Sequence, residues 1–434
     1  MRIVESLVAV GLPMLLYMMV YTDNVIYFYL ALAVGFMFVL KPIVILPFYF
    51  VASLSTSYFS LSSGMSAGRF AFVLVIISLL IQFVKNKDKV GTNPNSLFII
   101  VLIVFLFFSA ITSVTGSLDP FVQMTMNLLF LFFLYYCVDL DLDRFYRFLS
   151  IAYFVCLISI AFYIMKNGQE LFIQRFHDEE EAMNTNRLAM MCNQAGGLMF
   201  AIFLLAKKVG TKIVTIVGYI IAILEIIILG SRSPLIALLL TSIIGFFIYQ
   251  HVNKTIKRKN VYLLFSFLVF VFGVLVYYLS SIDSPLMERF TAESIVESKG
   301  TNRLNLIEII MTKIFPNYPL FGVGVGSKNI LEAGKLYGLE RPAHNIIIDP
   351  LSQMGMIGFS LFLLFIVPII IRSFKVALND RSLCFVILPS LLLFVTTAIN
   401  GIGEVVFYEK FFWNNLALCA FCLVLFKRNN FGTV

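Results

Sequence analysis

The stretch FGVGVGSKNILEAGKLYGLERPAHNIIIDP, residues 321–350, separates this chain from a plain series of membrane helices. It ends a long polar segment that begins near Ser281 and also contains Arg289 and Arg303. One of only three histidines, His344, lies within it. A polar segment of this length inside an otherwise apolar chain can bring soluble chemistry to the bilayer surface. We therefore expect a site for a phosphorylated lipid here rather than a simple pore.

The composition is that of an integral membrane protein. Of 434 residues, 60% are hydrophobic and 13% are charged, which excludes an ordinary soluble globular protein. Met1 and Arg2 precede an apolar run that resembles a signal peptide, but no A-x-A cleavage site follows. We expect an uncleaved first helix.

Apolar segments long enough to approach a 30 Å hydrocarbon core, which needs about 17–25 residues, mark the candidate transmembrane helices. They are residues 3–21, 25–40, 43–59, 69–84, 96–115, 120–138, 148–165, 188–206, 213–229, 234–250, 261–281, 351–371, 382–400 and 411–426. The sequence predicts an all-α, polytopic membrane helix bundle of about 14 helices. If 25–40 and 43–59 form one broken or re-entrant unit at Lys41-Pro42, the number falls to about 12 or 13. We divide the chain into N-terminal transmembrane helices, 1–165, and a catalytic membrane region, 166–434.

Positive charge decides the predicted orientation, because loops rich in Lys and Arg stay on the cytoplasmic side. With the N-terminus inside, the predicted inner loops and flanks hold 19 of the 32 Lys and Arg residues. Both termini are then cytoplasmic, and loops 166–187 and 282–350 are extracytoplasmic. The basic clusters predict contact with anionic membrane lipids. They are short, divided among loops and lack interleaved aromatic residues, so we expect no nucleic-acid partner.

All six cysteines lie in or at the edge of apolar segments, so the sequence predicts no disulfide framework. They are Cys137, Cys156, Cys192, Cys384, Cys419 and Cys422. Cys419 and Cys422 have CxxC spacing, but inside a predicted transmembrane helix. Small buried apolar side chains are the better interpretation there.

Loop 166–187 contains two polar groups. His177 and the acids at 178–181 look like a metal site, but consecutive side chains point in different directions, which favours a solvated acidic run. We expect no metal and no cofactor. Asn184-Thr-Asn186-Arg187 then opens a helix, where Asn and Thr are suited to N-capping. Asn186 and Arg187 are equally suited to binding sugar hydroxyls at the mouth of a cavity, and the two roles are compatible.

Arg232 lies in a tight turn, Gly230-Ser-Arg-Ser-Pro234, between two apolar helices. An arginine at the membrane boundary can extend to the interface, or it can bind an anion inside the bundle. Glu225, two helical turns upstream on the same face, is a candidate buried partner.

Residues 300–316 predict an amphipathic helix too short to span the membrane. Leu304, Ile307, Met311 and Ile314 fall at helical spacing, so we expect this helix to lie along the outer interface. Arg303 is in its first turn, where it can make bidentate contacts to phosphate or serve as an ordinary interfacial arginine.

Gly322-x-Gly324-x-Gly326 lacks the Gly-Lys-Ser/Thr of a P-loop, so it predicts a tight turn, one that a substrate can approach closely. His344 is the leading candidate for proton transfer, because an imidazole exchanges protons near neutral pH. A purely structural histidine with one hydrogen bond is the alternative. Arginines in the same segment, including Arg341, favour the catalytic role.

Several motifs occur in a recognisable order. They are Asn184-Thr-Asn-Arg-Leu-Ala189, Ser231-Arg-Ser233, Gly300-Thr-Asn-Arg303, Pro319-Leu-Phe-Gly-Val-Gly324, and His344-Asn345 with Gly355-x-x-Gly358. In this order, over about residues 184–360, the chain resembles the O-antigen ligase and polymerase superfamily of the Wzy and WaaL types. One departure is Gln353, where an acidic residue is often expected.

The resemblance implies a GT-C-like membrane enzyme that acts outside the inner membrane of a bacterium on undecaprenyl-diphosphate-linked oligosaccharides. It implies that Arg232 and Arg303 bind the diphosphate and that His344 activates the acceptor hydroxyl. We assign Asn186, Arg187, Arg341 and Asn345 to substrate binding. Two arginines can stabilise the leaving diphosphate in place of a divalent cation, so transfer is expected to be metal-independent.

We expect a polymerase that joins lipid-linked repeat units into O-antigen or capsule, with a chain-length regulator as a candidate partner. An O-antigen ligase that transfers glycan to lipid A core is the first alternative. A flippase or exporter of lipid-linked oligosaccharide is an alternative of another class. A flippase needs charged residues along a central path, and the predicted spans contain few charges, such as Glu5 and Glu225. This favours the enzyme.

The orientation is testable with topology reporters. A reporter fused after residue 255 should be cytoplasmic, and one inserted near residue 335 should be extracytoplasmic, because loop 251–260 holds four basic residues. The measurement is reporter activity specific to each compartment. Both reporters on one side would overturn the orientation.

Overall fold

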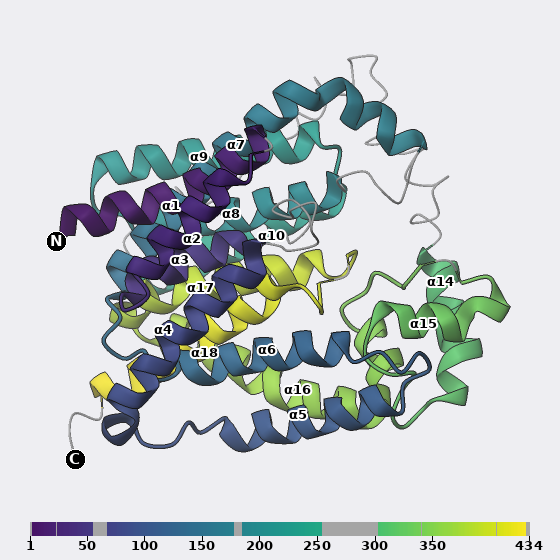
Figure 1. Ribbon diagram of the computed structural model, residues 1–434. Helices are drawn as coiled ribbons and strands as arrows, with labels where there is room; N and C mark the ends of the chain where they lie inside the picture. The colour runs from purple at the N-terminus through teal and green to yellow at the C-terminus, as the bar shows by residue number, and fades with distance from the viewer. Residues whose placement is uncertain are drawn as a thin grey trace.

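The computed structural model describes residues 2–22, 24–54, 67–177, 185–253, 303–339, 341–404 and 406–430. Throughout these residues the regular structure is helical (Figure 1). The predicted helix at 261–281, Arg289, the acids at 178–181 and residues 300–302 lie outside the described residues. The predictions made for them therefore stay predictions.

The longer helices run in the order of the predicted spans. They are α1 (Arg2–Thr22), α2 (Ile26–Met37), α3 (Pro42–Ala52), α4 (Ala67–Val90), α5 (Ser96–Ile111), α6 (Asp119–Leu134), α7 (Leu142–His177), α8 (Thr185–Leu205), α9 (Val209–Ile228), α10 (Arg232–Asn253), α16 (Ile348–Asn379), α17 (Arg381–Asn400) and α18 (Lys410–Asn430). Seven are long and apolar enough to cross a membrane, and the others are shorter apolar helices. The prediction of an all-α polytopic membrane protein is confirmed.

Burial separates central from peripheral helices. Nearly all of α8 and most of α17 are buried, whereas α9 and α10 are buried over less than half of their apolar length. Large apolar side chains are exposed on the outer helices, among them Val84, Leu97 and Val209. An apolar exterior of this kind is suited to lipid.

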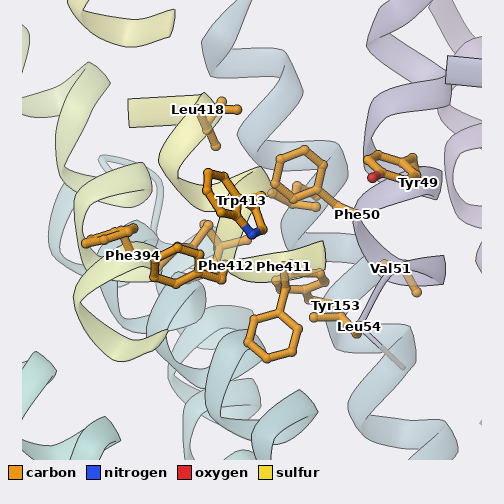
Figure 2. Close-up of a cluster of buried hydrophobic side chains, with 14 of the residues drawn as sticks. Tyr49, Phe50, Val51, Leu54, Tyr153, Phe394, Phe411, Phe412, Trp413 and Leu418 are labelled. Carbon is orange, nitrogen blue, oxygen red and sulfur yellow. The ribbon is translucent and has the colours of Figure 1, made fainter. Parts of the chain in front are cut away.

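The central helices are joined by a buried polar network. Gln194 of α8 donates from Nε2 to Thr397 Oγ1 of α17 at 2.8 Å, and Asn415 of α18 donates to Gln194 Oε1 at 2.7 Å. Such bonds hold helices together where lipid gives no hydrophobic driving force between them. Aromatic rings pack at the start of α18, where Phe412 and Trp413 contact edge to face (Figure 2).

One end of the bundle collects the residues predicted to be in inner loops. Glu5 of α1 pairs with Arg144 of α7 and lies 3.7 Å from Lys41, and Lys85 pairs with Asp139 at 2.8 Å. The start of α1 and the end of α18 lie toward this end (Figure 1). The predicted inner loops that contain Lys85, Asp139 and Arg144 are therefore joined to one another or to α1 by ion pairs, and which side of the membrane they face stays a prediction.

Some boundaries differ from the prediction. Helix α7 continues to His177, so part of the predicted loop 166–187 is helical, and it passes through residue 165, the predicted domain boundary. The division into two regions remains a prediction. The chain does break at Lys41-Pro42, and the two helices on either side have only 12 and 11 residues.

The predicted amphipathic helix is present, and its apolar face is shifted from the predicted stripe, of which Ile314 is buried and Leu304 is exposed. Helix α14 (Arg303–Ile309) is followed directly by a π-helical turn, Ile310–Ile314. Leu306, Ile310 and Ile314 are buried, whereas Leu304 is 69% exposed. A π-helical turn has more residues per turn than an α-helix, so a spacing of four keeps these side chains on one face.

The glycine-rich stretch crosses the kinked start of α16. In this crossing, residues 319–324 and 352–357 exchange backbone hydrogen bonds, such as Gly324 N–H to Gln353 O at 3.1 Å and Met356 N–H to Pro319 O at 2.8 Å. Gly355, at φ 63°, forms the kink. A Cβ at Gly322 would lie 2.3 Å from the Gln353 carbonyl carbon. A turn closes at Gly322, whose N–H donates to Tyr318 O at 3.1 Å. The backbone of α16 approaches Gly322, whereas Gly324 faces Ser113 and Gly326 faces Pro120.

The close approach is testable with two glycines of nearly equal conformation. Gly322 and Gly338 have φ of 72° and 71°, but a Cβ at Gly338 meets nothing within 4 Å. Gly338→Ala should cost about 1–2 kcal/mol of stability for its left-handed backbone. Gly322→Ala should cost a further ~1–3 kcal/mol from overpacking. The measurement is thermal unfolding in detergent, and equal losses would contradict the crossing.

Candidate functional site

His344 has an uncommon backbone conformation that its neighbours hold in place. Its φ is 53°, and it is the one residue other than glycine with positive φ in the described part of the chain. The buried carboxylate of Asp349 accepts hydrogen bonds from both flanking amides, Ala343 N–H at 3.1 Å and Asn345 N–H at 3.0 Å. A strained residue that is fixed from both sides is typical of a functional site.

The loop between α17 and α18 is fastened to this segment. Ile346 N–H donates to Gly401 O at 2.7 Å, and Asn345 Nδ2 donates to Ile402 O at 3.3 Å. These bonds bring Glu404 to the imidazole, where its Oε2 lies 3.9 Å from His344 Nδ1. Glu404 is buried, whereas 30% of the His344 side chain is exposed. A carboxylate at this distance can stabilise positive charge on the imidazole.

His344 opens into a polar cavity of about 410 Å³. The cavity is lined by Pro120, Gln123, Arg187, Met190, Gly326, Ser327, Pro342, His344, Glu404, Tyr408 and Glu409. These residues come from α6, α8, the loop before α15 (Ser327–Gly334), the segment before α16, and the loop before α18. Two carboxylates, an arginine and an imidazole therefore share one pocket.

Charge on the Arg187 side of this pocket is partly balanced. Arg187 Nη2 lies 3.7 Å from Glu409 Oε1. Burial raises the pKa of Glu409 above its ordinary value, and the positive charges of Arg187 and Lys410 oppose that shift. Burial also raises the pKa of Tyr408, whose hydroxyl accepts the Gly326 N–H at 3.1 Å. The tyrosine therefore stays neutral and fixes the loop.

The predicted residues on α8 and α10 lie at the start of both helices. Ser231 Oγ donates to Asn186 Oδ1 at 2.9 Å, and Ser233 Oγ donates to Asn400 Oδ1 at 3.1 Å. Arg232 lies between these two serines as the first residue of α10. The structure thus joins the turn of Arg232 to the residue preceding Arg187.

The predicted pairing of Glu225 with Arg232 is wrong. Glu225 is buried in α9, and its Oε2 accepts a hydrogen bond from Cys192 Sγ of α8 at 3.1 Å. Helix α9 ends at Ile228 and α10 begins at Arg232, so Glu225 and Arg232 do not share one continuous helical face. All six cysteines are buried, which confirms their interpretation as small apolar side chains.

The remaining predicted residues belong to the segment around α14 and α15. Arg303 is the first residue of α14, whose Leu306 shares a small apolar core with Ala343, the neighbour of His344. Arg341 is exposed, shortly before Ala343. Asn345 Oδ1 accepts hydrogen bonds from the Ile347 and Ile348 amides, so it caps the start of α16. Its role in substrate binding stays a prediction.

Sequence reasoning missed Glu404, Tyr408 and Glu409. The available signal was two carboxylates in the short connection GIGEVVFYEK, 401–410, between two apolar helices. It also left Gln353 unexplained. This residue is fully buried, and its Oε1 accepts the Gly326 N–H at 2.8 Å, so it fastens the glycine-rich turn.

Asp349 can be tested as the residue that fixes the His344 backbone. Asp349→Ala leaves two amides without their acceptor, which should cost about 1–3 kcal/mol each where they are buried. Asp349→Asn keeps one acceptor oxygen and should lose less. The measurement is thermal unfolding of both variants in detergent. Equal stability of the alanine variant and the unmodified protein would show that these bonds do not hold the segment.

Comparison with known proteins bears on the same region. Residues 217–363 match the family model described as O-antigen ligase, a range that contains Arg232, Arg303, Arg341 and His344. No curated protein matches the chain. The match supports a role of this integral membrane protein in assembly of O-antigen or a related polysaccharide as a glycosyltransferase-like enzyme. The match thus supports assignment of residues 217–363 to the O-antigen ligase/polymerase superfamily.

Proposed function

We propose that this chain is a polymerase that joins undecaprenyl-diphosphate-linked repeat units into O-antigen or capsule at the outer face of the bacterial inner membrane. The observation that carries the proposal is the cavity of about 410 Å³ in which His344, Glu404 and Arg187 meet. The cavity combines a base, an acid and a cation, and the base, His344, lies within the range that the family model matches.

His344 acts as the general base in this proposal. It removes the proton from a hydroxyl of the acceptor sugar as that oxygen bonds to the anomeric carbon of the donor. The bond from the anomeric carbon to the diphosphate oxygen breaks, and the electron pair leaves with undecaprenyl diphosphate. Glu404, 3.9 Å from Nδ1, stabilises the imidazolium that forms.

Arg232 and Arg303 bind the diphosphate of the donor. The diphosphate gains one negative charge as it leaves, and fixed guanidinium groups stabilise charge that develops in the transition state. Their planar forks match phosphate oxygens in pairs, so the proposed transfer needs no metal ion. Asn186, Arg187, Arg341 and Asn345 bind the glycan. A lipid-linked donor also explains why the catalytic site lies at one end of a membrane bundle.

The ligase and the flippase predict different products in cells. Loss of the polymerase should leave one repeat unit on each acceptor and remove the polymer ladder on a gel. Loss of a ligase should leave lipid A core without any glycan. Loss of a flippase should trap the lipid-linked unit on the cytoplasmic side. Gel analysis of surface glycan from a strain lacking the protein separates the three, and only the first pattern agrees with the proposal.

His344 is tested by measuring donor binding and turnover on the same purified variants. His344→Ala should reduce turnover by about 10²–10⁴-fold with donor binding largely retained, because a base acts in the transition state. Glu404→Gln should lower turnover less. His251→Ala, which changes a histidine near the end of α10, is the matched control and should be fully active.

Two further measurements sharpen this test. Arg303→Lys keeps the charge but loses the planar fork, so donor use should weaken.

Activity should persist in excess EDTA, and its loss with rescue by magnesium would remove the diphosphate role from the arginines. If His344→Ala loses binding in proportion to turnover, His344 is a donor contact or a structural residue instead of the base.

A further inference from the structure

Two uncharged polar side chains, Gln123 of α6 and Tyr408 of the loop before α18, line the pocket beside its charged groups. The side-chain nitrogen of Gln123, Nε2, donates to the backbone oxygen of Tyr408 at 2.8 Å. The two residues are therefore neighbours in the wall of the cavity, although 285 positions separate them in the chain. This part of the lining suits an uncharged group of a substrate better than a phosphate.

The bond to Tyr408 fixes which way the Gln123 amide faces. Because Nε2 points at a carbonyl oxygen, Oε1 is the atom left on the other side of the amide. Among the described residues no donor bonds to Oε1, and it is not one of their buried polar atoms that lack a partner. Gln123 therefore offers an accessible hydrogen-bond acceptor.

The Tyr408 hydroxyl offers the complementary group, a donor. Its oxygen accepts the N–H of Gly326, which also lines the cavity, and its own proton has no acceptor among the described residues. The Phe407 ring contacts the tyrosine ring edge to face, with centroids 5.2 Å apart. A hydroxyl can donate one hydrogen bond while it accepts another, so this proton is available to a ligand.

The Tyr408 hydroxyl is not needed to satisfy the Gly326 amide. The same N–H also bonds to Oε1 of the fully buried Gln353 at 2.8 Å, compared with 3.1 Å to the tyrosine. Without the hydroxyl, this amide keeps an acceptor. The turn at Gly326 therefore gives no strong structural reason for a tyrosine instead of a phenylalanine at position 408.

The acceptor and the donor lie at opposite ends of Tyr408. Gln123 Oε1 is near its backbone oxygen, whereas the hydroxyl is at the tip of its ring. A sugar hydroxyl has its donor and its acceptor on one oxygen atom. A secondary amide carries its N–H and C=O on opposite sides of a planar trans group, so it fits this arrangement better.

An apolar surface lies at the hydroxyl end. A Cβ added at Gly326 would lie 2.6 Å from Cγ of Pro120, another residue that lines the cavity. The Pro120 ring is therefore next to the turn that the Tyr408 hydroxyl binds. In an N-acetyl group the methyl is attached to the carbonyl carbon, so a carbonyl that faces Tyr408 brings the methyl toward this ring.

We propose that Gln123 and Tyr408 bind the N-acetyl group of a 2-acetamido sugar in the glycan that enters the pocket. Gln123 Oε1 accepts the N–H, the Tyr408 hydroxyl donates to the C=O, and Pro120 contacts the methyl. The inference rests on the proposed function and adds a class of sugar to it. It also assigns a substrate contact to α6, which lies outside residues 217–363 and within the predicted N-terminal region 1–165.

Binding of simple glycosides tests the inference without any assay of transfer. The probes are the methyl glycosides of N-acetylglucosamine, 2-O-acetylglucose and glucose, measured on the protein in nanodiscs by saturation-transfer NMR. The N-acetyl glycoside should bind about 2–10-fold more tightly than the O-acetyl glycoside, which lacks the N–H and so loses one hydrogen bond. Saturation should be strongest at the acetyl methyl. Equal binding of all three, or no binding of the N-acetyl glycoside, would overturn the inference.

Two substitutions separate the two contacts. Tyr408→Phe should weaken binding of both acetylated glycosides about 2–10-fold, because both keep the carbonyl. Gln123→Met should weaken binding of the N-acetyl glycoside alone, because only that probe has an N–H. Tyr337→Phe, which changes an exposed tyrosine, is the matched control and should bind as the unmodified protein does. Unchanged binding of the N-acetyl glycoside by Tyr408→Phe would overturn the inference.

Stability separates a ligand contact from a structural tyrosine. Without ligand, Tyr408→Phe should unfold at the same temperature as the unmodified protein, because Gln353 still accepts the Gly326 N–H. A clearly lower temperature with equal losses for all three glycosides would assign the hydroxyl a structural role and overturn the inference. If the temperature falls but the losses differ, the selectivity of Gln123→Met between the two acetylated probes decides.

Lipid-linked substrates distinguish this inference from the proposed function. If the protein polymerises units with and without an acetamido sugar, and Tyr408→Phe treats both as the unmodified protein does, the inference fails while the proposed function stands. If the N-acetyl glycoside binds through Tyr408 but no lipid-linked unit is polymerised, the proposed function fails while the binding site stands.

Discussion

The arrangement of the site depends on one backbone crossing, in which residues 319–324 pack against the kinked start of α16. At Gly322 no side chain separates the two backbone segments. The amides of Val323 and Gly324 donate to the carbonyl oxygens of Ser352 and Gln353, which replaces helical hydrogen bonds that are lost at the kink. The crossing fixes both ends of the polar segment that contains α15 and His344. The segment also has a small apolar core of its own, and Gly326, Asn345 and Ile346 bond to the loop between α17 and α18.

From this crossing the pocket is assembled by backbone groups more than by ion pairs. Asp349 holds the amides on both sides of His344, and Asn345 caps the helix that follows. The Gly326 amide is shared by Gln353 and Tyr408, which joins the glycine-rich turn to the loop before α18. The charged side chains of the pocket are therefore not needed to hold the backbone and can face the cavity. Their electrostatic effect is stronger there because solvent is restricted.

Basic side chains occur at both ends of the molecule, but they are paired with acids differently at each end. At the end with Glu5, each basic group near the core has an acid beside it, as in the pairs of Arg144 and Lys85. At the end with His344, one carboxylate, Glu409, lies 3.7 Å from Arg187 and also interacts with Lys410. The Nζ of Lys410 is buried and makes no hydrogen bond within the described part of the chain. The cations at this end are therefore less closely paired than Arg144 is with Glu5.

The sequence by itself determined the membrane class, the order and approximate bounds of the apolar helices, and the motifs that carry the family resemblance. These features are local: apolar runs and their charged ends report directly on burial in lipid. Only the tertiary structure decided that Glu404, Tyr408 and Glu409 meet His344 and that Cys192 is the partner of Glu225. It also showed that Gly322 is needed for a backbone crossing with α16, whereas Gly326 lines the cavity. Such contacts join residues far apart in the chain, and no periodicity or spacing records which helix ends will meet.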